Sequence, residues 1–173
     1  MYPYLRTARV LLAARLGSRL DFEEEGSIRL RVWPGDIDIF AELNNGRFLT
    51  LMDMGRLDLG MRCGLLGLLH RRGWGLTVGG ASVRFRHRVP PFSRVTLTTK
   101  LVGTDDRWFY FNQRIIRGDR VSAGALVRAA VTSKEGLVAP ARVMEALDAP
   151  RTTIDPPAWV QAWIEAEARR EWP

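Results

Sequence analysis

The sequence predicts an α+β fold in which an antiparallel sheet wraps around one long central helix. The first observation is a helical pattern over residues 44–61 whose apolar side chains cover most of the circumference, so this helix is expected to be buried. The second is a set of segments that alternate between apolar and polar side chains, one before the helix and four after it. A sheet that curls around the helix accounts for both observations.

The first 20 residues predict an additional helix. Leu5, Leu12 and Leu16 share one side of a helical wheel, with arginines close to them. We expect this helix to pack on the domain, and weak peripheral contact of residues 1–20 with a membrane is the alternative. The apolar run at residues 10–14 is too short to span a bilayer, and a secretory cleavage site is missing.

A carboxylate-bearing loop is expected directly before the central helix. Residues 27–33 alternate as a strand, and the loop that follows carries Asp36 and Asp38. Asn44 then has the residue type preferred as a helix N-cap. Free backbone N–H groups and the positive end of the helix dipole collect at such a terminus. A carboxylate beside a site that can polarise a carbonyl group is suited to acyl transfer.

The remaining elements follow from changes of hydrophobic period. A short helix is expected over residues 65–72, and a two-residue turn at Gly118-Asp119 joins the last two strands as a hairpin. The strands are expected at residues 75–89 (with a bulge at Gly79-Gly80), 94–103, 107–117 and 121–134, and two further helices at 142–147 and 158–172. We divide the chain into a helical extension (1–24), a main domain (25–148) and a linker with a C-terminal helix (149–173).

The amino-acid composition argues against a disulfide and a zinc site in this chain. The chain has 173 residues, 46% of them hydrophobic, which is enough for one well-packed domain. Cys63 is the single cysteine, so an intrachain disulfide is excluded, and a reducing, cytoplasmic location is expected. Cys63, His70 and His87 lack the spacing of zinc ligands, so no metal site is predicted.

The net charge of +7 comes mainly from arginines spread along the chain. Nucleic acid, an anionic membrane and a phosphate-bearing small molecule are partners that such a charge suits, and improved solubility alone would also account for it. Dispersed arginines argue against a dedicated nucleic-acid-binding arm, so no nucleic-acid partner is expected.

The loop and helix resemble the signature of hotdog-fold thioesterases of the 4-hydroxybenzoyl-CoA thioesterase type, D-x-D-x-x-G-H-V-N-N-x-x-Y. The matching positions are Asp36, Asp38, Ala41, Glu42, Leu43, Asn44, Asn45 and Phe48. The likeness extends over residues 28–147, where the chain looks like the thioesterase superfamily member 6 group and its bacterial relatives. It implies the hotdog fold, with the extra N- and C-terminal helices added to it.

The resemblance implies a role for two groups in thioester hydrolysis. Asp38 would be the catalytic carboxylate, acting as a nucleophile or as a general base on water. The backbone N–H of Asn45 would polarise the thioester carbonyl. Glu42, Asn44 and Phe48 would contact substrate, and the site would form across a dimer interface.

Three positions depart from the family pattern. Ala41 replaces the usual glycine, Glu42 the usual histidine and Phe48 the usual tyrosine. Glu42 is expected either to raise the pKa of Asp38 by repulsion between like charges or to point to solvent. Its presence leaves open whether activity is retained.

Bound coenzyme A would bring several phosphate charges, which arginine side chains suit. Arg107 is the preferred candidate, because it stands at a strand entrance. The other candidates are Arg84, Arg86 and Arg88.

Structural roles compete with several of the functional ones. Asp36 and Asp38 suit turns, and Asn44 suits a helix cap. We expect Asp53 to pair with Arg56, although helix carboxylates catalyse in other hotdog branches. Packing or surface roles are expected of the remaining candidates, namely Cys63, His70, His87, Trp108 and Tyr110.

The function predicted from these observations is cofactor-independent hydrolysis of an acyl thioester. The substrate would be acyl-CoA or an acyl-carrier-protein thioester, with coenzyme A present only as part of the substrate. The enzyme would be a homodimer or homotetramer in which the last strand or an edge strand extends the sheet between subunits. The alternatives are a non-catalytic module that binds acyl thioesters or acyl chains, and a basic peripheral membrane or scaffold protein.

Overall fold

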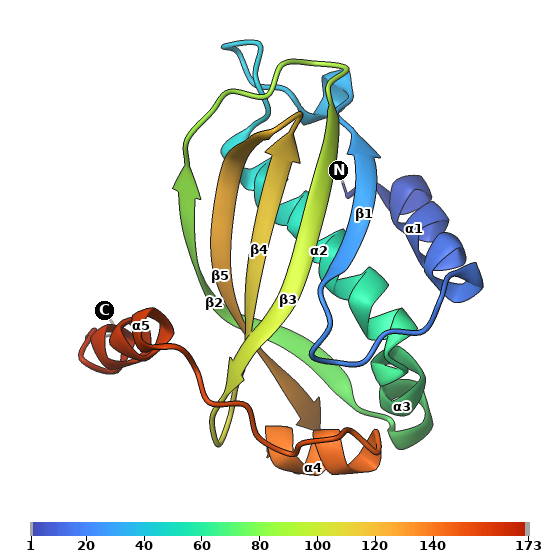
Figure 1. The fold of residues 1–173 in the computed structure, drawn as a ribbon, viewed down its shortest axis with the longest axis vertical. Helices are drawn as coiled ribbons and strands as arrows, with labels where there is room; N and C mark the ends of the chain where they lie inside the picture. The colour runs from blue at the N-terminus through green and yellow to red at the C-terminus, as the bar shows by residue number, and fades with distance from the viewer. Residues whose placement is uncertain (1, 172–173) are drawn as a thin grey trace.

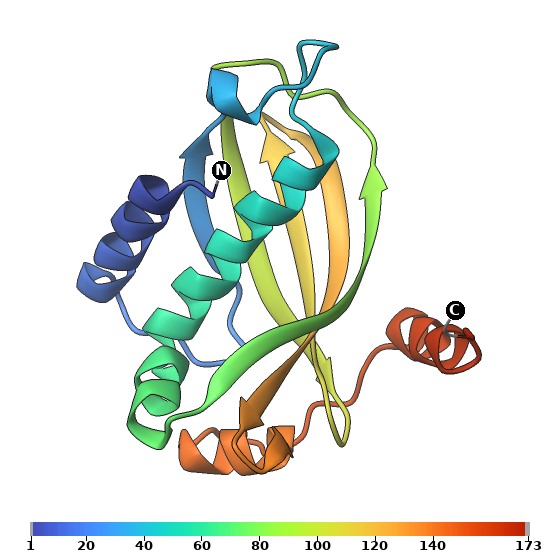
Figure 2. The ribbon, with the colours of Figure 1, turned by 180° about the vertical axis from the view of Figure 1, so that it is seen from behind.

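The computed structural model describes residues 2–171 and has the predicted α+β architecture. Figure 1 shows a curled antiparallel sheet with the long helix α2 behind it, and Figure 2 shows α2 from the other side. The strands are β1 (Gly26–Arg31), β2 (Gly75–Phe85), β3 (Arg94–Thr104), β4 (Phe109–Arg117), β5 (Arg120–Ser133) and β6 (Gly136–Val138). The helices are α1 (Tyr4–Leu16), η1 (Pro34–Asp36, a 3-10 turn), α2 (Asn45–Arg62), α3 (Leu65–Arg72), α4 (Pro140–Ala146) and α5 (Ala158–Ala168).

The strand order is β1-β3-β4-β5-β2, and the short β6 pairs with β5. All pairs are antiparallel. The strands β1 and β2 therefore form the two edges of the sheet. β5 lies in the interior between β4 and β2, so the expectation that the last strand extends the sheet across subunits is wrong for β5. Only an edge strand has free backbone groups along its length.

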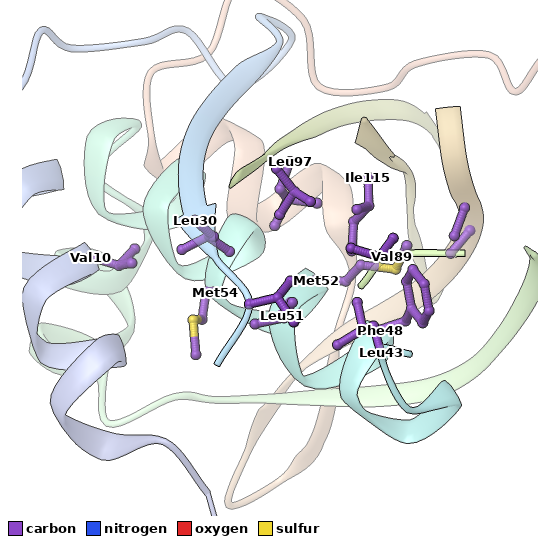
Figure 3. Close-up of a cluster of buried hydrophobic side chains, with 14 of the residues drawn as sticks. Val10, Leu30, Leu43, Phe48, Leu51, Met52, Met54, Val89, Leu97 and Ile115 are labelled. Carbon is purple, nitrogen blue, oxygen red and sulfur yellow. The ribbon is translucent and has the colours of Figure 1, made fainter. Parts of the chain in front are cut away.

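The core lies between α2 and the concave face of the sheet. Leu51, Met52 and Met54 of α2 are fully buried and belong to one cluster with Leu97 and Ile115 of the sheet (Figure 3). Gly55 permits the close approach of helix and sheet, because a Cβ atom there would clash with Thr99 and Leu97 of β3. The helix is thus buried by the sheet on one side, as its apolar circumference predicts.

The helix α1 covers another side of α2, which confirms that the N-terminal segment packs on the domain. It buries Thr7, Val10 and Ala14. The shared leucine side noted in the sequence faces the opposite way: Leu5, Leu12 and Leu16 are 85%, 61% and 80% exposed. Both sets of residues have helical spacing, so the spacing alone does not tell which side of α1 packs on the domain.

Several boundaries differ from prediction. β2 ends at Phe85 and not at residue 89, because the N–H groups of Arg86 and His87 both donate to the carbonyl of Ser122 and end the regular pairing. The predicted bulge is present between Val78 and Gly80. β6 was not predicted, since three residues after a turn give too short a pattern. The C-terminal helix ends at Ala168, earlier than the predicted end at Trp172, and Trp172 itself lies outside the described residues.

The helix α5 packs on the convex face of the sheet, opposite α2. Val160 is fully buried there, beside Tyr110 and Leu126. The linker before α5 is tied to the end of β3, where the N–H of Thr104 donates to the carbonyl of Ile154 at 2.8 Å. Both faces of the sheet therefore carry helices.

Candidate active site

Asp36 holds the beginning of the predicted catalytic loop. Its carboxylate is buried, accepts the N–H of Trp33 at 2.9 Å and forms an ion pair with Arg6 at 2.8 Å. Its carbonyl accepts the N–H of Asn44, also at 2.9 Å. A carboxylate with these partners stabilises the loop, which confirms the structural role expected of Asp36.

Asp38 lies further along the same loop and is only partly buried. Its Oδ1 accepts the N–H of Phe40 at 2.9 Å, and its N–H donates to the carbonyl of Glu42 at 2.9 Å. An Asp side chain that bonds the backbone two residues on is typical of a turn. Oδ2 has no hydrogen-bond partner within residues 2–171, so one of the two carboxylate oxygens is available for chemistry.

The N-terminus of α2 offers one free backbone donor. The side chain of Asn44 caps the helix by accepting the N–H of Gly46 at 2.9 Å, as predicted. The carbonyl of Asn44 accepts the N–H groups of Arg47 and Phe48. The N–H of Asn45 is the remaining donor of the first turn, and it has no acceptor in the described part of the chain. It lies at the positive end of the helix dipole.

The loop brings Asp38 and Asn45 to the same end of the sheet. A bridge pairs Ile37 with Leu43, so Asp38 follows one partner of the bridge and the helix start follows the other. In Figures 1 and 2 this loop lies between the end of β1 and the beginning of α2. A carboxylate oxygen can act as a base or a nucleophile, and a free N–H at a helix start can polarise a carbonyl group.

Glu42 does not point freely into solvent, which corrects one of the two expectations for it. Its Oε2 lies 3.0 Å from Nε of Arg88, and its side chain is 27% exposed. The negative charge of Glu42 is therefore balanced by an arginine that the sequence suggested only as a phosphate ligand. No pairing rule along the sequence connects these two residues, because the loop and the segment that follows β2 meet only in the folded chain.

Phe48 is a core residue. It is 4% exposed, and its ring lies 5.1 Å from the ring of Phe85 at the end of β2. Phe85 is 48% exposed, so the pair reaches from the core to the surface beside the loop. Phe48 is thus a packing residue, and Phe85 forms the surface beside the loop.

Arg107 is not near this loop. It lies in the turn between β3 and β4, where its N–H donates to Asp105 at 2.7 Å. This turn is at the opposite end of the sheet from η1 (Figure 1). Within one chain, Arg107 and Asp38 do not form one site.

Two other candidate arginines, Arg84 and Arg86, line a groove of about 920 Å³ on the convex face. Sequence reasoning missed the residues that complete this groove, Arg114 of β4 and Trp159 and Trp163 of α5. Trp159 is 51% exposed. The stripe of tryptophans in the last helix was visible in the sequence, but the strand on which it packs was not.

The remaining candidates have structural or surface positions. Asp53 pairs with Arg56 at 3.1 Å, as expected, and also accepts the hydroxyl of Tyr2 at 2.9 Å. Burial raises the pKa of the Cys63 thiol to about 11, so Cys63 is a protonated packing residue near neutral pH. His70 and His87 are exposed.

Tyr110 of β4 and Trp108, which directly precedes this strand, are packing residues. The hydroxyl of Tyr110 donates to Asp105, and burial raises the pKa of this tyrosine. Trp108 lies directly over Gly79 of β2, where no side chain would fit, and carries the guanidinium of Arg128 at 5.1 Å. These contacts agree with the packing roles expected of both rings.

Residues 2–171 contain no group of three or more His, Cys, Asp or Glu side chains that could hold a metal ion. Among the described helices, none is both long and apolar enough to cross a membrane.

The model of the thioesterase-like superfamily matches residues 32–164, which include the loop, α2 and the whole sheet after β1. The chain is 32% identical to protein THEM6 of Drosophila melanogaster over 135 residues, 76% of this chain and 67% of that protein. It is 31% identical to protein THEM6 of Xenopus laevis over 128 residues, 72% of this chain but only 62% of the Xenopus protein.

A solved structure with the same fold is the 1,4-dihydroxy-2-naphthoyl-CoA thioesterase from Synechocystis. The TM-score is 0.62 at 12% identity, and the alignment covers 72% of this chain and 95% of that one. At this identity the likeness establishes the hotdog fold alone. Together with the family match, the loop signature and the sheet wrapped on α2 lead to one assignment: the chain belongs to the thioesterase-like superfamily.

Proposed function

We propose that this protein hydrolyses acyl-CoA thioesters, with Asp38 as the catalytic carboxylate and the N–H of Asn45 as the donor to the thioester oxygen. The observation that carries the proposal is that a carboxylate oxygen of Asp38 and the N–H of Asn45, both without a partner in the described residues, flank the same bridge at the start of α2. The fold neighbour from Synechocystis is a CoA thioesterase, which supports the substrate class.

The carboxylate would act in one of two ways. As a general base it would remove a proton from water while the water oxygen attacks the carbonyl carbon and the CoA thiolate leaves. As a nucleophile it would attack the carbonyl carbon, expel the CoA thiolate and form a mixed anhydride, which water then hydrolyses to the free acid and the regenerated carboxylate. In both routes negative charge develops on the thioester oxygen, and the N–H of Asn45 and the helix dipole stabilise it. Neither route uses a metal or a cofactor beyond the CoA of the substrate.

A second subunit would complete the site. Ile39 and Phe40 at the tip of the loop are 93% and 68% exposed, although both are apolar. Phe85, Val78 and Leu76 on the neighbouring edge strand β2 are also 39–49% exposed. Apolar residues concentrated on a loop and an adjacent sheet edge are typical of an interface. A homodimer formed along β2 would cover them and enclose the substrate.

The test is thiol release from a panel of acyl-CoA esters and acyl-carrier-protein thioesters of different chain length. Asp38→Asn keeps an oxygen to accept the Phe40 N–H but loses the charge, so we expect kcat/KM to fall by at least about 100-fold with folding unchanged. Asp106→Asn, an exposed aspartate in the β3–β4 turn, is the matched control. A wild type inactive on every substrate, or an Asp38→Asn variant as fast as the wild type, would contradict the proposal.

The ion pair between Glu42 and Arg88 favours a second candidate function, a non-catalytic module that binds acyl thioesters. The family signature has a histidine at this position. In this chain the residue is Glu42, and Arg88 balances its negative charge. Calorimetric titration with a non-hydrolysable acyl-CoA thioether separates the two. Binding without any turnover of the corresponding thioester would favour the module.

The exposed leucines of α1 favour contact with a membrane surface as an additional property. Leu5, Leu12 and Leu16 project away from the domain beside Arg9 and Arg15, a combination that suits an anionic lipid interface. We expect Leu5→Gln with Leu16→Gln to reduce co-sedimentation with phosphatidylcholine–phosphatidylserine vesicles severalfold. The control is Leu137→Gln, an exposed leucine on β6. Equal sedimentation of the wild type and both variants would rule out membrane contact through the exposed leucines of α1.

A further inference from the structure

A groove of about 720 Å³ separates α1 from the outer edge of β1, and the hydrolysis proposed above does not use it. One wall is α1, and the other is the strand itself, from Ser27 to Arg31. Figures 1 and 2 show α1 running beside this edge of the sheet. The helix packs mainly on α2, and within residues 2–171 no backbone hydrogen bond joins it to β1, so the backbone groups of the strand edge stay open along the groove.

The outer edge of β1 has free backbone groups. Among the described strands, β1 pairs with β3 alone. Just beyond β1, Val32 donates to Ser93 and accepts from Phe92 on the inner side. Because backbone direction alternates along a strand, the N–H and C=O groups of Arg29 and Arg31 point outward. No described residue bonds them, and an unpaired edge of this kind is a template for an added strand.

The groove is strongly basic. Arg9, Arg29 and Arg31 line it without an ion pair in the described part of the chain. The single carboxylate among the lining residues, Asp58, lies 3.6 Å from Arg62. Buried Nη1 of Arg6 also has no hydrogen-bond acceptor in the described structure, although Nη2 of the same residue binds Asp36. Acceptor oxygens on a ligand would satisfy these donors.

One end of the groove carries an aromatic pair. Trp33 and Phe92 are 45% and 50% exposed, with ring centroids 6.3 Å apart and nearly perpendicular planes. The guanidinium of Arg31 lies 5.2 Å from the Trp33 ring and 6.0 Å from the Phe92 ring. This end offers an apolar surface to a large side chain at the terminus of a bound segment.

We propose that the groove binds an extended acidic segment of a partner protein, which adds to β1 as a further strand. Its backbone would pair with Arg29 and Arg31, its acidic side chains would lie beside these arginines, and an aromatic residue would rest on Trp33. A second copy of β1 fits this edge poorly, because arginines would then face arginines across the new pair.

The probe is a fluorescein-labelled peptide of alternating glutamate and valine that ends in tryptophan, measured by fluorescence anisotropy. We expect it to bind at least about tenfold more tightly than the same peptide with lysine in place of glutamate. Two further versions carry N-methyl groups on one or the other set of alternate residues. One of the two should fail to bind, because only one set of N–H groups faces β1.

Hydrogen exchange supplies a readout that charge attraction alone would not move. The amide protons of Arg29 and Arg31 should exchange at least about tenfold more slowly with peptide bound. The double variant Arg29→Glu with Arg31→Glu should bind the glutamate peptide at least tenfold more weakly than the wild type and should prefer the lysine peptide. Arg117→Glu with Arg120→Glu, at the exposed β4–β5 turn, makes the same change of net charge and is the control.

Three results would overturn the proposal. The first is that the control pair of substitutions weakens binding of the glutamate peptide as much as the Arg29 and Arg31 substitutions do. The second is that both methylated peptides bind as tightly as the unmethylated one. The third is an oligomer that dissociates when Arg29 and Arg31 are replaced by glutamate, since this would make β1 an interface between copies of the chain.

Discussion

The thiol of Cys63 is protected by its surroundings. Its Sγ lies 3.7 Å from the carbonyl oxygen of Gly60, and burial raises its pKa to about 11. At pH 8 only about one thiol in a thousand is ionised, whereas an ordinary cysteine is partly ionised. The thiolate is the form that attacks disulfide reagents, so this pKa determines the labelling rate.

We therefore expect Cys63 to react with Ellman's reagent at least about 100-fold more slowly in the native protein than in the urea-unfolded chain at pH 8. The native rate should rise about tenfold per pH unit up to the raised pKa. Equal rates in the folded and unfolded protein would contradict this burial. Slow labelling also keeps the background low in the thiol-release assay.

The sequence predicts the contacts of single residues with close neighbours but not those with distant residues. The turn role of Asp36, the cap at Asn44 and the pair of Asp53 with Arg56 depend on neighbours within four residues, and all three were predicted. Arg88, the partner of Glu42, and Gln113, the second partner of Arg56, lie far along the chain from them. Arg56 is buried and donates to Gln113 of β4, whose amide nitrogen in turn donates to the carbonyl of Met52 at 2.7 Å. No local sequence pattern predicts such a network of hydrogen bonds.

At the scale of elements, two glycines of α2 have opposite surroundings. A Cβ atom at Gly55 would clash with Thr99 and Leu97 of β3. A Cβ atom at Gly60 would meet the Leu66 side chain at 3.4 Å, an ordinary contact. The helix therefore needs a glycine at residue 55 to lie on the sheet, but not at residue 60.

We expect Gly55→Ala to lower the free energy of unfolding by about 1–3 kcal/mol, because the helix or β3 must move. Gly60→Ala is the control and should raise it by up to about 1 kcal/mol, because alanine favours the helical backbone. Urea unfolding of both variants measures the difference. If Gly55→Ala is as stable as Gly60→Ala, α2 and β3 do not pack as closely as described.

Element types were predicted well, and their ends less well. The alternation of β3, β4 and β5 and the turn at Gly118-Asp119 were clear because each pattern extends over many residues. The end of β2 was missed because residues 86–89 continue the alternation, although the pairing with β5 has already stopped. The hydrogen bonds to Ser122 that end it involve a residue far along the chain.

At the scale of the whole molecule, the exposed apolar residues of β2 predict a dimer. Val78 is 49% exposed in the single chain. We expect light scattering after size exclusion to give at least twice the chain mass of 19.6 kDa. Val78→Lys should shift this mass toward the monomer, because a buried lysine without a partner is costly at an interface.

Leu137→Lys is the matched control for the dimer, since Leu137 on β6 has the same exposure. It should leave the mass unchanged. A monomeric wild type, or equal dissociation by the two variants, would argue against β2 as the interface. Thioesterase activity should fall together with the dimer if the second subunit encloses the substrate.

The strand order has one more consequence. β1 and β2 lie at opposite edges of the same sheet, so pairing at one edge leaves the other uncovered. Two chains joined along β2 would form one continuous sheet with a basic β1 groove at each far end. Such a particle is bivalent, and a partner that carries two acidic segments on a linker long enough to reach both grooves would bind by avidity. A dimer of this kind would retain an enzyme at a multivalent scaffold even if each groove bound weakly.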